Sequence, residues 1–232
     1  MVFVHGFMGT PDIFRVLMRA AYEHGFSVMS VLLPGHGAPA MEFAKARMSD
    51  WETHIKTELD KYGHYDQIDL VGHSIGGLLA LLVSLDTGYK IGRAVLLFTP
   101  LKVYLINPFA LLTRFRTHIG RKDDEISKAY RDLVSVRCGF PAYVMCLNVL
   151  LQPHKLMRTV KKRLGEITIP TLVIHSKNDE TASFKSSKLF DKGLIHSRHK
   201  IITLNDSYHT YLTRGDWERI QDEVLDFLKN RG

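Results

Sequence analysis

A serine, an aspartate and a histidine, far apart along the chain, are the residues that could together cleave an acyl bond. Ser74 is the centre of the sequence Gly-His-Ser-Ile-Gly at 72–76, directly after the apolar run 68–71. Glycines around a serine between a strand and a helix allow a sharp turn that holds the hydroxyl out at the end of a sheet. A neutral serine is a poor nucleophile, so it needs a nearby base and an acid that orients this base. The alternative is an ordinary serine in a turn of small residues.

The acid and the base are expected in loops that follow two later strands. Residues 169–175 form a short β-branched run after a proline, which predicts a buried parallel strand, and the loop behind it contains Asp179 and Glu180. We predict Asp179 as the acid, with Glu180 next to it as the alternative. A further strand at 200–204 leads into the loop that contains His209. Sites form outside the carboxyl ends of such strands, in the order nucleophile, acid and base.

Position in the chain, rather than residue type, distinguishes His209 among the 12 histidines. Most of the others are expected at the surface or as core residues with satisfied ring nitrogens. His73 adjoins Ser74, but its side chain should leave the turn in another direction. His175 is expected to pack at the end of its strand. We therefore predict His209 as the base.

Two main-chain N–H groups are expected to stabilise the negative charge that develops on the substrate oxygen. One belongs to Ile75, the residue after the serine. The other belongs to Phe7, in the loop His-Gly-Phe-Met-Gly-Thr at 5–10, where Gly6 lets the backbone turn toward the site. Losing one such donor typically lowers turnover by roughly 10²–10³. The alternative is that this loop is only a tight connection between a strand and a helix.

Strands and helices alternate along most of the chain, which predicts an α/β fold with a doubly wound, mostly parallel sheet. Ser49 and Glu52 have the spacing of a capping box, which predicts the start of a helix that runs to about residue 62. Other helices are expected at about 11–24 and 217–229. The expected strands span 1–4, 27–32, 68–71, 91–98, 169–175 and 200–204.

The alternation stops between residues 101 and 165, where bulky apolar residues recur without a strand pattern. We expect one domain, 1–232, with a helical cap inserted at 101–165. Because the insertion lies between Ser74 and Asp179 in the chain, it could cover the site, exclude water and form an acyl-binding pocket. The alternative is that its apolar residues simply bury against the sheet.

Length and composition fit a single domain that needs no cofactor. The chain has 232 residues, of which 45% are hydrophobic, enough for a sizeable core. The longest apolar run, 140–151, is too short to cross a bilayer, and no secretory signal is visible, which predicts a cytoplasmic protein. Cys138 and Cys146 are expected in one helix, about 12 Å apart along its axis, too far for a disulfide. No Cys/His cluster has metal-ligand spacing.

The formal net charge of +7 suggests a basic surface. We interpret it as a solvated face, with weak attraction to anionic lipid surfaces as the alternative. We expect a small-molecule ester as the partner, no nucleic acid and no stable membrane insertion. The basic residues gather at Arg114, Arg116, Arg121, Lys122, Arg158, Lys161, Lys162 and Arg163.

The chain resembles the α/β-hydrolase superfamily, and within it the small bacterial carboxylesterases related to monoacylglycerol lipases. The resemblance implies a serine esterase with Ser74 as nucleophile, Asp179 as acid and His209 as base, acting on short to medium acyl esters or monoacylglycerols. It also implies the oxyanion hole. The alternatives are an acyl thioesterase and a non-catalytic binding protein on a hydrolase scaffold. The resemblance rests on residues 5–10, Pro-Gly-His-Gly at 34–37, Asp50-Trp51, 72–77, Asn178-Asp179-Glu180 and Ser207-Tyr208-His209.

Two features depart from the family pattern. Tyr208 stands where the family usually has a glycine before the catalytic histidine. The family fold also usually has one or two strands before the first strand of this chain. Without them, the strand at 27–32 is expected at an exposed edge of the sheet, and unpaired apolar edges favour association. This predicts either a shortened chain or pairing with a second copy as a homodimer.

Overall fold

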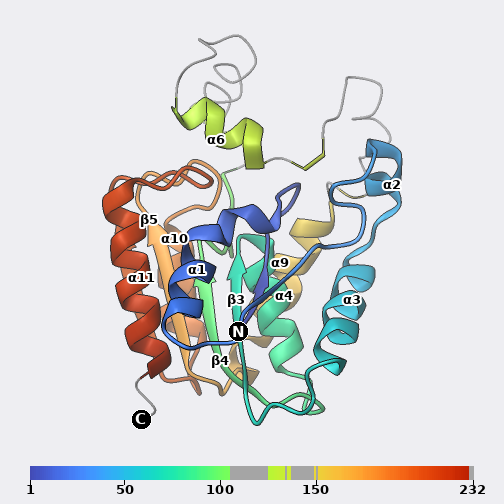
Figure 1. Ribbon diagram of the computed structural model, residues 1–232, viewed down its shortest axis with the longest axis vertical. Helices are drawn as coiled ribbons and strands as arrows, with labels where there is room; N and C mark the ends of the chain where they lie inside the picture. Colours follow the sequence, from blue (N-terminus) through green and yellow to red (C-terminus); the bar gives the residue numbers. More distant parts are fainter. Residues whose placement is uncertain (105–124, 134, 137–148, 150, 230–232) are drawn as a thin grey trace.

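The computed structural model describes residues 1–104, 125–133, 135–136, 149 and 151–229 (Figure 1). Its described strands form one six-stranded sheet in the order β2-β1-β3-β4-β5-β6, in which every neighbouring pair is parallel. The fold is therefore the α/β-hydrolase fold predicted from the sequence. The strands are β1 (Val2–Val4), β2 (Met29–Val31), β3 (Ile68–His73), β4 (Ile91–Leu97), β5 (Thr171–Ser176) and β6 (His199–Leu204).

Helices cover both faces of the sheet (Figure 1). One face carries α1 (Arg15–Glu23) and α11 (Arg214–Lys229), which contact each other, and the other carries α3 (Met48–Asp60), α4 (Ile75–Ser84) and α9 (Gln152–Arg163). Successive strand residues point to opposite faces, so Val95 and Leu96 of β4 enter different clusters of the core. A sheet buried on both faces requires the near-continuous apolar runs that the sequence contains. The remaining helical segments are η1 (Pro11–Phe14), α2 (Ala40–Lys45), α6 (Glu125–Leu133), η2 (Leu164–Glu166) and α10 (Lys185–Gly193).

The start of α3 differs from the expected capping box. The carboxylate of Asp50 accepts the backbone N–H of Arg47 at 2.9 Å, so Arg47, rather than Ser49, precedes the first helical residue. An aspartate in the first turn also interacts favourably with the positive end of the helix. The helix therefore begins at Met48.

The predicted insertion is described only in part. The helix α6 lies beyond the carboxyl ends of the strands (Figure 1), whereas α9 packs beside α3 and α4 and buries Leu156, Met157 and Val160. Ser135, after α6, donates its N–H to the carbonyl oxygen of Met8 at 2.8 Å, which ties the insertion to the loop after β1. The cysteines 138 and 146, and most of the apolar run 140–151, lie outside the described residues. The boundaries of the cap stay a prediction.

The strand β2 lies at one edge of the sheet, as the sequence predicted. Its last residue, Val31, is buried, while the following Leu32 is 48% exposed. Pairing of this edge with a second copy stays a prediction. Within the part of the chain that the structure describes, no helix has the length and apolar character needed to cross a bilayer.

Candidate active site

Ser74 occupies a strained turn between β3 and α4. Its backbone has φ 55° and ψ −125°, a conformation that residues other than glycine rarely adopt. Two main-chain hydrogen bonds hold the turn: Ser74 N–H donates to the carbonyl of Leu97 at 2.9 Å, and Gly77 N–H donates to the carbonyl of Ser74 at 3.1 Å. This turn places Ser74 directly after the carboxyl end of β3.

The glycines on either side of Ser74 are required by close backbone approach. A Cβ atom at Gly72 would lie 2.3 Å from the Cα of Gly77, and one at Gly76 would lie 2.0 Å from the carbonyl oxygen of Val4. Both neighbours are backbone atoms, which cannot rotate away. The glycines therefore let α4 pack directly against the ends of β1 and β3.

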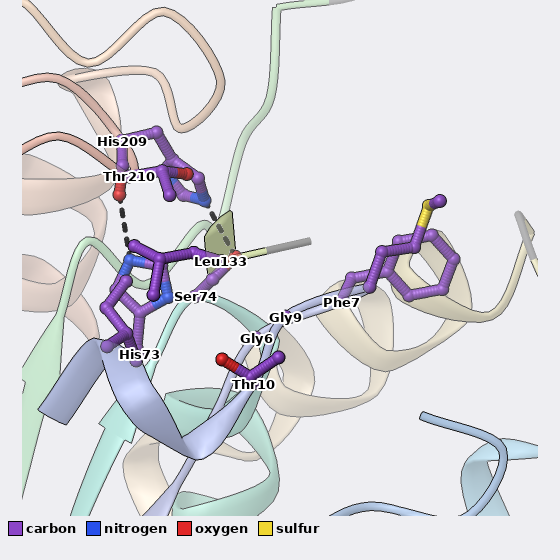
Figure 2. A pocket seen from close by; sticks show the side chains of 11 residues that line it. Gly6, Phe7, Gly9, Thr10, His73, Ser74, Leu133, His209 and Thr210 are labelled. Carbon is purple, nitrogen blue, oxygen red and sulfur yellow. Dashed lines mark hydrogen bonds between the residues drawn. The ribbon is translucent and has the colours of Figure 1, made fainter. Parts of the chain in front are cut away.

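The structure brings Ser74, His209 and Asp179 into one hydrogen-bonded series. The Oγ of Ser74 lies 2.9 Å from Nε2 of His209 (Figure 2), and Nδ1 of His209 lies 2.8 Å from Oδ2 of Asp179. A carboxylate can only accept, so Nδ1 carries the hydrogen and Nε2 is free to accept the serine hydroxyl. All three side chains are nearly buried, with the residues 3–8% exposed. This arrangement can activate the hydroxyl as a nucleophile.

Asp179 is fixed by its own loop after β5. Its second oxygen, Oδ1, accepts the backbone N–H groups of Thr181 at 2.8 Å and Ala182 at 2.7 Å. Burial raises the pKa of the Asp179 carboxyl, while the charge and hydrogen bond of His209 oppose this rise. Burial alone lowers the pKa of His209, but the charge and hydrogen bond of Asp179 and the charge of Glu180 outweigh it, so the pKa is raised.

The other buried histidines near the site do not contact the serine hydroxyl. Residues 205–213, between β6 and α11, form the histidine loop, which contains His209. The ring of His73 points to this loop, and its Nε2 donates to the carbonyl oxygen of His209 at 2.8 Å (Figure 2). His175, in β5, is fully buried with its ring 6.2 Å from that of Phe190. Burial, and then the charge of His209, lowers the pKa of each of these two rings to about 3. Both are neutral in the pH range where His209 titrates.

The loop after β1 faces Ser74 from the side opposite to His209 (Figure 2). Gly6 and Phe7 line the same hollow as Ser74 and His209 (Figure 2). Met8 also belongs to this lining. Met8 has φ 55°, and its N–H donates to Nε2 of His36 at 3.1 Å. This N–H is therefore directed away from the hollow. Ile75 is the first residue of α4, where a backbone N–H has no partner within the helix.

The match to known sequences decides the family. Residues 1–220 match the family described as the alpha/beta hydrolase family. The chain belongs to this family.

The relatives of this hydrolase include enzymes named for ester cleavage. It is 26% identical over 230 residues to the thermostable monoacylglycerol lipase of Bacillus sp. (strain H-257), covering 97% of this chain and 88% of the relative. It is 21% identical over 236 residues to a carboxylesterase of Bacillus subtilis (strain 168), covering 97% and 90%. A solved structure of the metagenome-derived lipolytic enzymes LipS and LipT aligns with a TM-score of 0.77 and 20% identity, covering 99% and 93%, which supports the fold. These similarities support an esterase or lipase type of hydrolase.

Four residues contact the hydrolase site in ways that the sequence did not predict. Glu180 was only the alternative to Asp179, yet its Oε2 accepts the backbone N–H of His209 at 3.1 Å. Tyr130 of α6 donates its hydroxyl to Glu180, and Ser135 contacts Met8. His36 belongs to the Pro-Gly-His-Gly motif, which was the one available signal for it. The described residues contain no cluster of three His, Cys, Asp or Glu side chains suited to a metal ion.

Proposed function

We propose that this hydrolase is a serine carboxylesterase of the monoacylglycerol lipase type, working through an acyl-enzyme intermediate. The observation that carries the proposal is the position of one imidazole, with Nε2 2.9 Å from Ser74 Oγ and Nδ1 2.8 Å from Asp179 Oδ2. A base that contacts both a nucleophile and an orienting acid is the arrangement on which acyl transfer to serine depends. The names of the relatives support an ester as the substrate.

The first step forms the acyl-enzyme. Ser74 Oγ attacks the carbonyl carbon of the ester while Nε2 of His209 accepts the hydroxyl proton. The carbonyl electron pair moves onto oxygen, and the N–H groups of Phe7 and Ile75 donate hydrogen bonds to the resulting oxyanion. The bond to the alcohol then breaks, and His209 gives its proton to the leaving oxygen. Asp179 holds the ring in the required tautomer and stabilises the imidazolium.

The second step returns the enzyme to its starting state. Nε2 of His209 accepts a proton from water, and the water oxygen attacks the acyl carbon bound to Ser74. The oxyanion forms again at the same two N–H groups. When it collapses, the bond to Ser74 Oγ breaks, the carboxylic acid leaves and the proton passes from His209 to Ser74.

An uncharged acyl group suits the hollow beside Ser74. Its described lining includes the apolar side chains of Phe7, Met8, Ile13 and Leu133, and none of these described lining residues carries a carboxylate or an amine. Apolar walls with a few polar groups at one point are typical of small-molecule sites. We therefore propose short or medium acyl esters, or monoacylglycerols, as substrates.

Replacing Ser74 by alanine tests the nucleophile. We expect Ser74→Ala to lower kcat for p-nitrophenyl butyrate by about 10⁴-fold or more and to abolish labelling by a fluorophosphonate. Ser84→Ala is the matched control, because Ser84 lies at the far end of the same helix and donates only to the carbonyl of Leu81 at 2.8 Å. A Ser74→Ala protein that keeps near-parental hydrolysis would refute the proposal. Comparing the turnover of an ester and a thioester that carry the same acyl chain decides between an esterase and a thioesterase.

A further inference from the structure

A second carboxylate, Glu180, is buried beside the proposed acid. Glu180 is only 5% exposed. A buried carboxylate is costly unless hydrogen-bond donors compensate for the lost water. Donors among the described residues include the backbone N–H of His209 at 3.1 Å, the hydroxyl of Tyr130, and the hydroxyl of Thr181 at 3.4 Å. Two of these partners connect Glu180 to other segments: the loop that carries His209, and helix α6.

The two adjacent carboxylates hold different parts of the same histidine. Asp179 accepts from the ring, whereas Glu180 accepts from the main chain of His209. The carbonyl oxygen of His209 is held by His73. Ring, N–H and carbonyl are thus each fixed by a different side chain, which leaves the imidazole little freedom to turn away from Ser74.

Tyr130 extends this network to helix α6. Its hydroxyl contacts both Glu180 and the side chain of Thr210, the residue after His209. A second contact joins the same two segments, because Tyr211 donates its hydroxyl to Glu125 of α6 at 2.8 Å. The helix is therefore attached to the histidine loop at two places, and its last residue, Leu133, lines the hollow beside Ser74.

We propose that Glu180 is a positioning residue for His209, and that Tyr130 links the seating of helix α6 to the position of this base. This inference rests on the hydrolase mechanism proposed above. Through its charge, Glu180 also stabilises the protonated form of His209 that both chemical steps generate. Through its hydrogen bond, it fixes the backbone from which the imidazole projects.

The pH dependence of the site separates the charge of Glu180 from its packing. Within the described part of the chain, the titratable groups that face His209 are Asp179 and Glu180 of the loop after β5, His73 of β3, His175 of β5 and Tyr130 of α6. The two histidines stay neutral, and burial raises the pKa of Tyr130 so that it also stays neutral. Removing the charge of Glu180 should therefore lower the pKa of His209.

The first experiment measures the pH dependence of fluorophosphonate labelling, which reports the base of the free enzyme. We expect Glu180→Gln to move the acid limb to lower pH by about half a unit to one unit, less than the shift of about 1–3 caused by a directly adjacent opposite charge. Asp206→Asn removes an exposed carboxylate from the loop that contains His209, and it should leave the acid limb at the parental pH. Coincident limbs for Glu180→Gln and the parent protein would overturn the inference.

Glu180→Asp separates the effect of the negative charge from that of the side-chain length. It also tests the proposal if Glu180→Gln fails to fold. It keeps the negative charge but shortens the side chain, so we expect an acid limb near the parental position and a kcat about 3–10-fold lower, because a hydrogen bond is weakened. An acid limb displaced from the parental position by about half a unit or more, or an unchanged kcat, would contradict the proposed role.

A double-variant cycle tests the link to α6. Tyr130→Phe should lower kcat about 3–10-fold, and the double variant with Glu180→Gln should lose little more than Glu180→Gln alone, because Tyr130 acts on His209 through Glu180. Tyr22→Phe, on a tyrosine that is 70% exposed, is the matched control. Fully additive losses would refute the link. Failure of the parent protein to react with the fluorophosphonate would instead refute the proposed hydrolase mechanism.

Discussion

At the scale of single residues, Ser74 combines a strained backbone with neighbours that leave no space for a side chain. A non-glycine residue in such a conformation costs of order 1–3 kcal/mol and persists only where its surroundings enforce it. Here the enforcing contacts are the hydrogen bonds to Leu97 and Gly77 and the close approach of Gly76 to Val4. The position of the hydroxyl therefore depends on backbone packing as much as on the histidine that contacts it.

Gly76→Ala tests this dependence. Its Cβ would lie 2.0 Å from the carbonyl oxygen of Val4, so we expect a loss of about 3 kcal/mol or more in the free energy of unfolding, and a large loss of labelling at Ser74. Gly215→Ala is the control, because nothing lies within 4 Å of its added Cβ and it stands in the first turn of α11. That variant should be neutral or more stable by up to about 1 kcal/mol. Denaturant titrations of the two variants measure the difference, and equal stabilities would contradict the packing argument.

The sequence predicted the types and the order of the proposed catalytic residues, but not the contacts that orient them. Ser74, Asp179 and His209 follow a motif order, which one chain can reveal. Glu180 could be seen only as a rival to Asp179, because its neighbours come from α6 and from the histidine loop. Contacts between segments so distant in the chain depend on how the elements pack, which periodicity does not determine.

At the scale of elements, strands were predicted better than helix boundaries. Buried β-branched runs after turn residues locate β3, β4 and β5 directly, and the edge position of β2 follows from the family topology. The start of α3 was misplaced because Asp50 and Ser49 both suit the first turn, and the hydrogen bond that chooses between them forms only in the fold. The helices α2 and α10 were not predicted. Each is short, with 6 and 9 residues, and buries a single large apolar side chain, Phe43 in α2 and Phe190 in α10.

The loop after β1 depends on a contact with the Pro-Gly-His-Gly segment. Nε2 of His36 accepts the N–H of Met8, and Nδ1 of His36 donates to the carbonyl of Leu33 at 3.2 Å. The ring packs 5.0 Å from that of Phe43 and 5.7 Å from that of Trp51. Burial, and then the charge of His5, lowers the pKa of His36 to about 3, so it remains an acceptor at neutral pH. The contact with His36 thus holds Met8, and the residue before it, Phe7, carries the N–H proposed to bind the oxyanion.

His36→Phe should therefore affect turnover more than substrate binding. The new ring keeps the aromatic packing but cannot accept the N–H of Met8, and an unsatisfied buried donor costs about 1–3 kcal/mol. The oxyanion forms in the transition state and not in the bound substrate. We therefore expect kcat to fall about 10-fold or more with KM little changed. His64→Phe, at an exposed position, is the control. Steady-state kinetics in which KM alone rises would show that His36 shapes binding instead.

At the scale of the whole molecule, buried neutral histidines make the folded state sensitive to acid. Burial lowers the pKa of His5 to about 4 and those of His36, His73 and His175 to about 3. In the unfolded chain these rings titrate near their ordinary value of about 6.5, so unfolding takes up protons below that pH. Stability is thus lost progressively as the pH falls from about 6.5 toward 4. The raised pKa of His209 has the opposite sign: its stabilising contribution is gained as the pH falls through the raised pKa and is complete below about pH 6.5, so it leaves the slope at lower pH unchanged.

His175→Leu tests the acid sensitivity. Each such histidine contributes about 1.4 kcal/mol per pH unit to the fall in the free energy of unfolding below pH 6. Replacing the fully buried His175 by an apolar residue should make that fall shallower by this amount. His196→Gln, an exposed histidine, should leave the slope unchanged. Urea titrations between pH 7 and pH 5 give the slopes, and identical slopes for the parent and His175→Leu would contradict this account.

The separation of Ser74 and His209 by 135 positions also determines when activity can arise during refolding. Strand β6, which precedes the loop with His209, lies at the far edge of the sheet, where β5 is its one neighbour among the described strands. Parallel pairings between distant segments form slowly, because each closes a long loop. A nascent or partly refolded chain can therefore acquire most of its secondary structure before it can turn over a single molecule. Recovery of hydrolysis would then report the assembly of the sheet from β3 to β6 rather than the collapse of the chain.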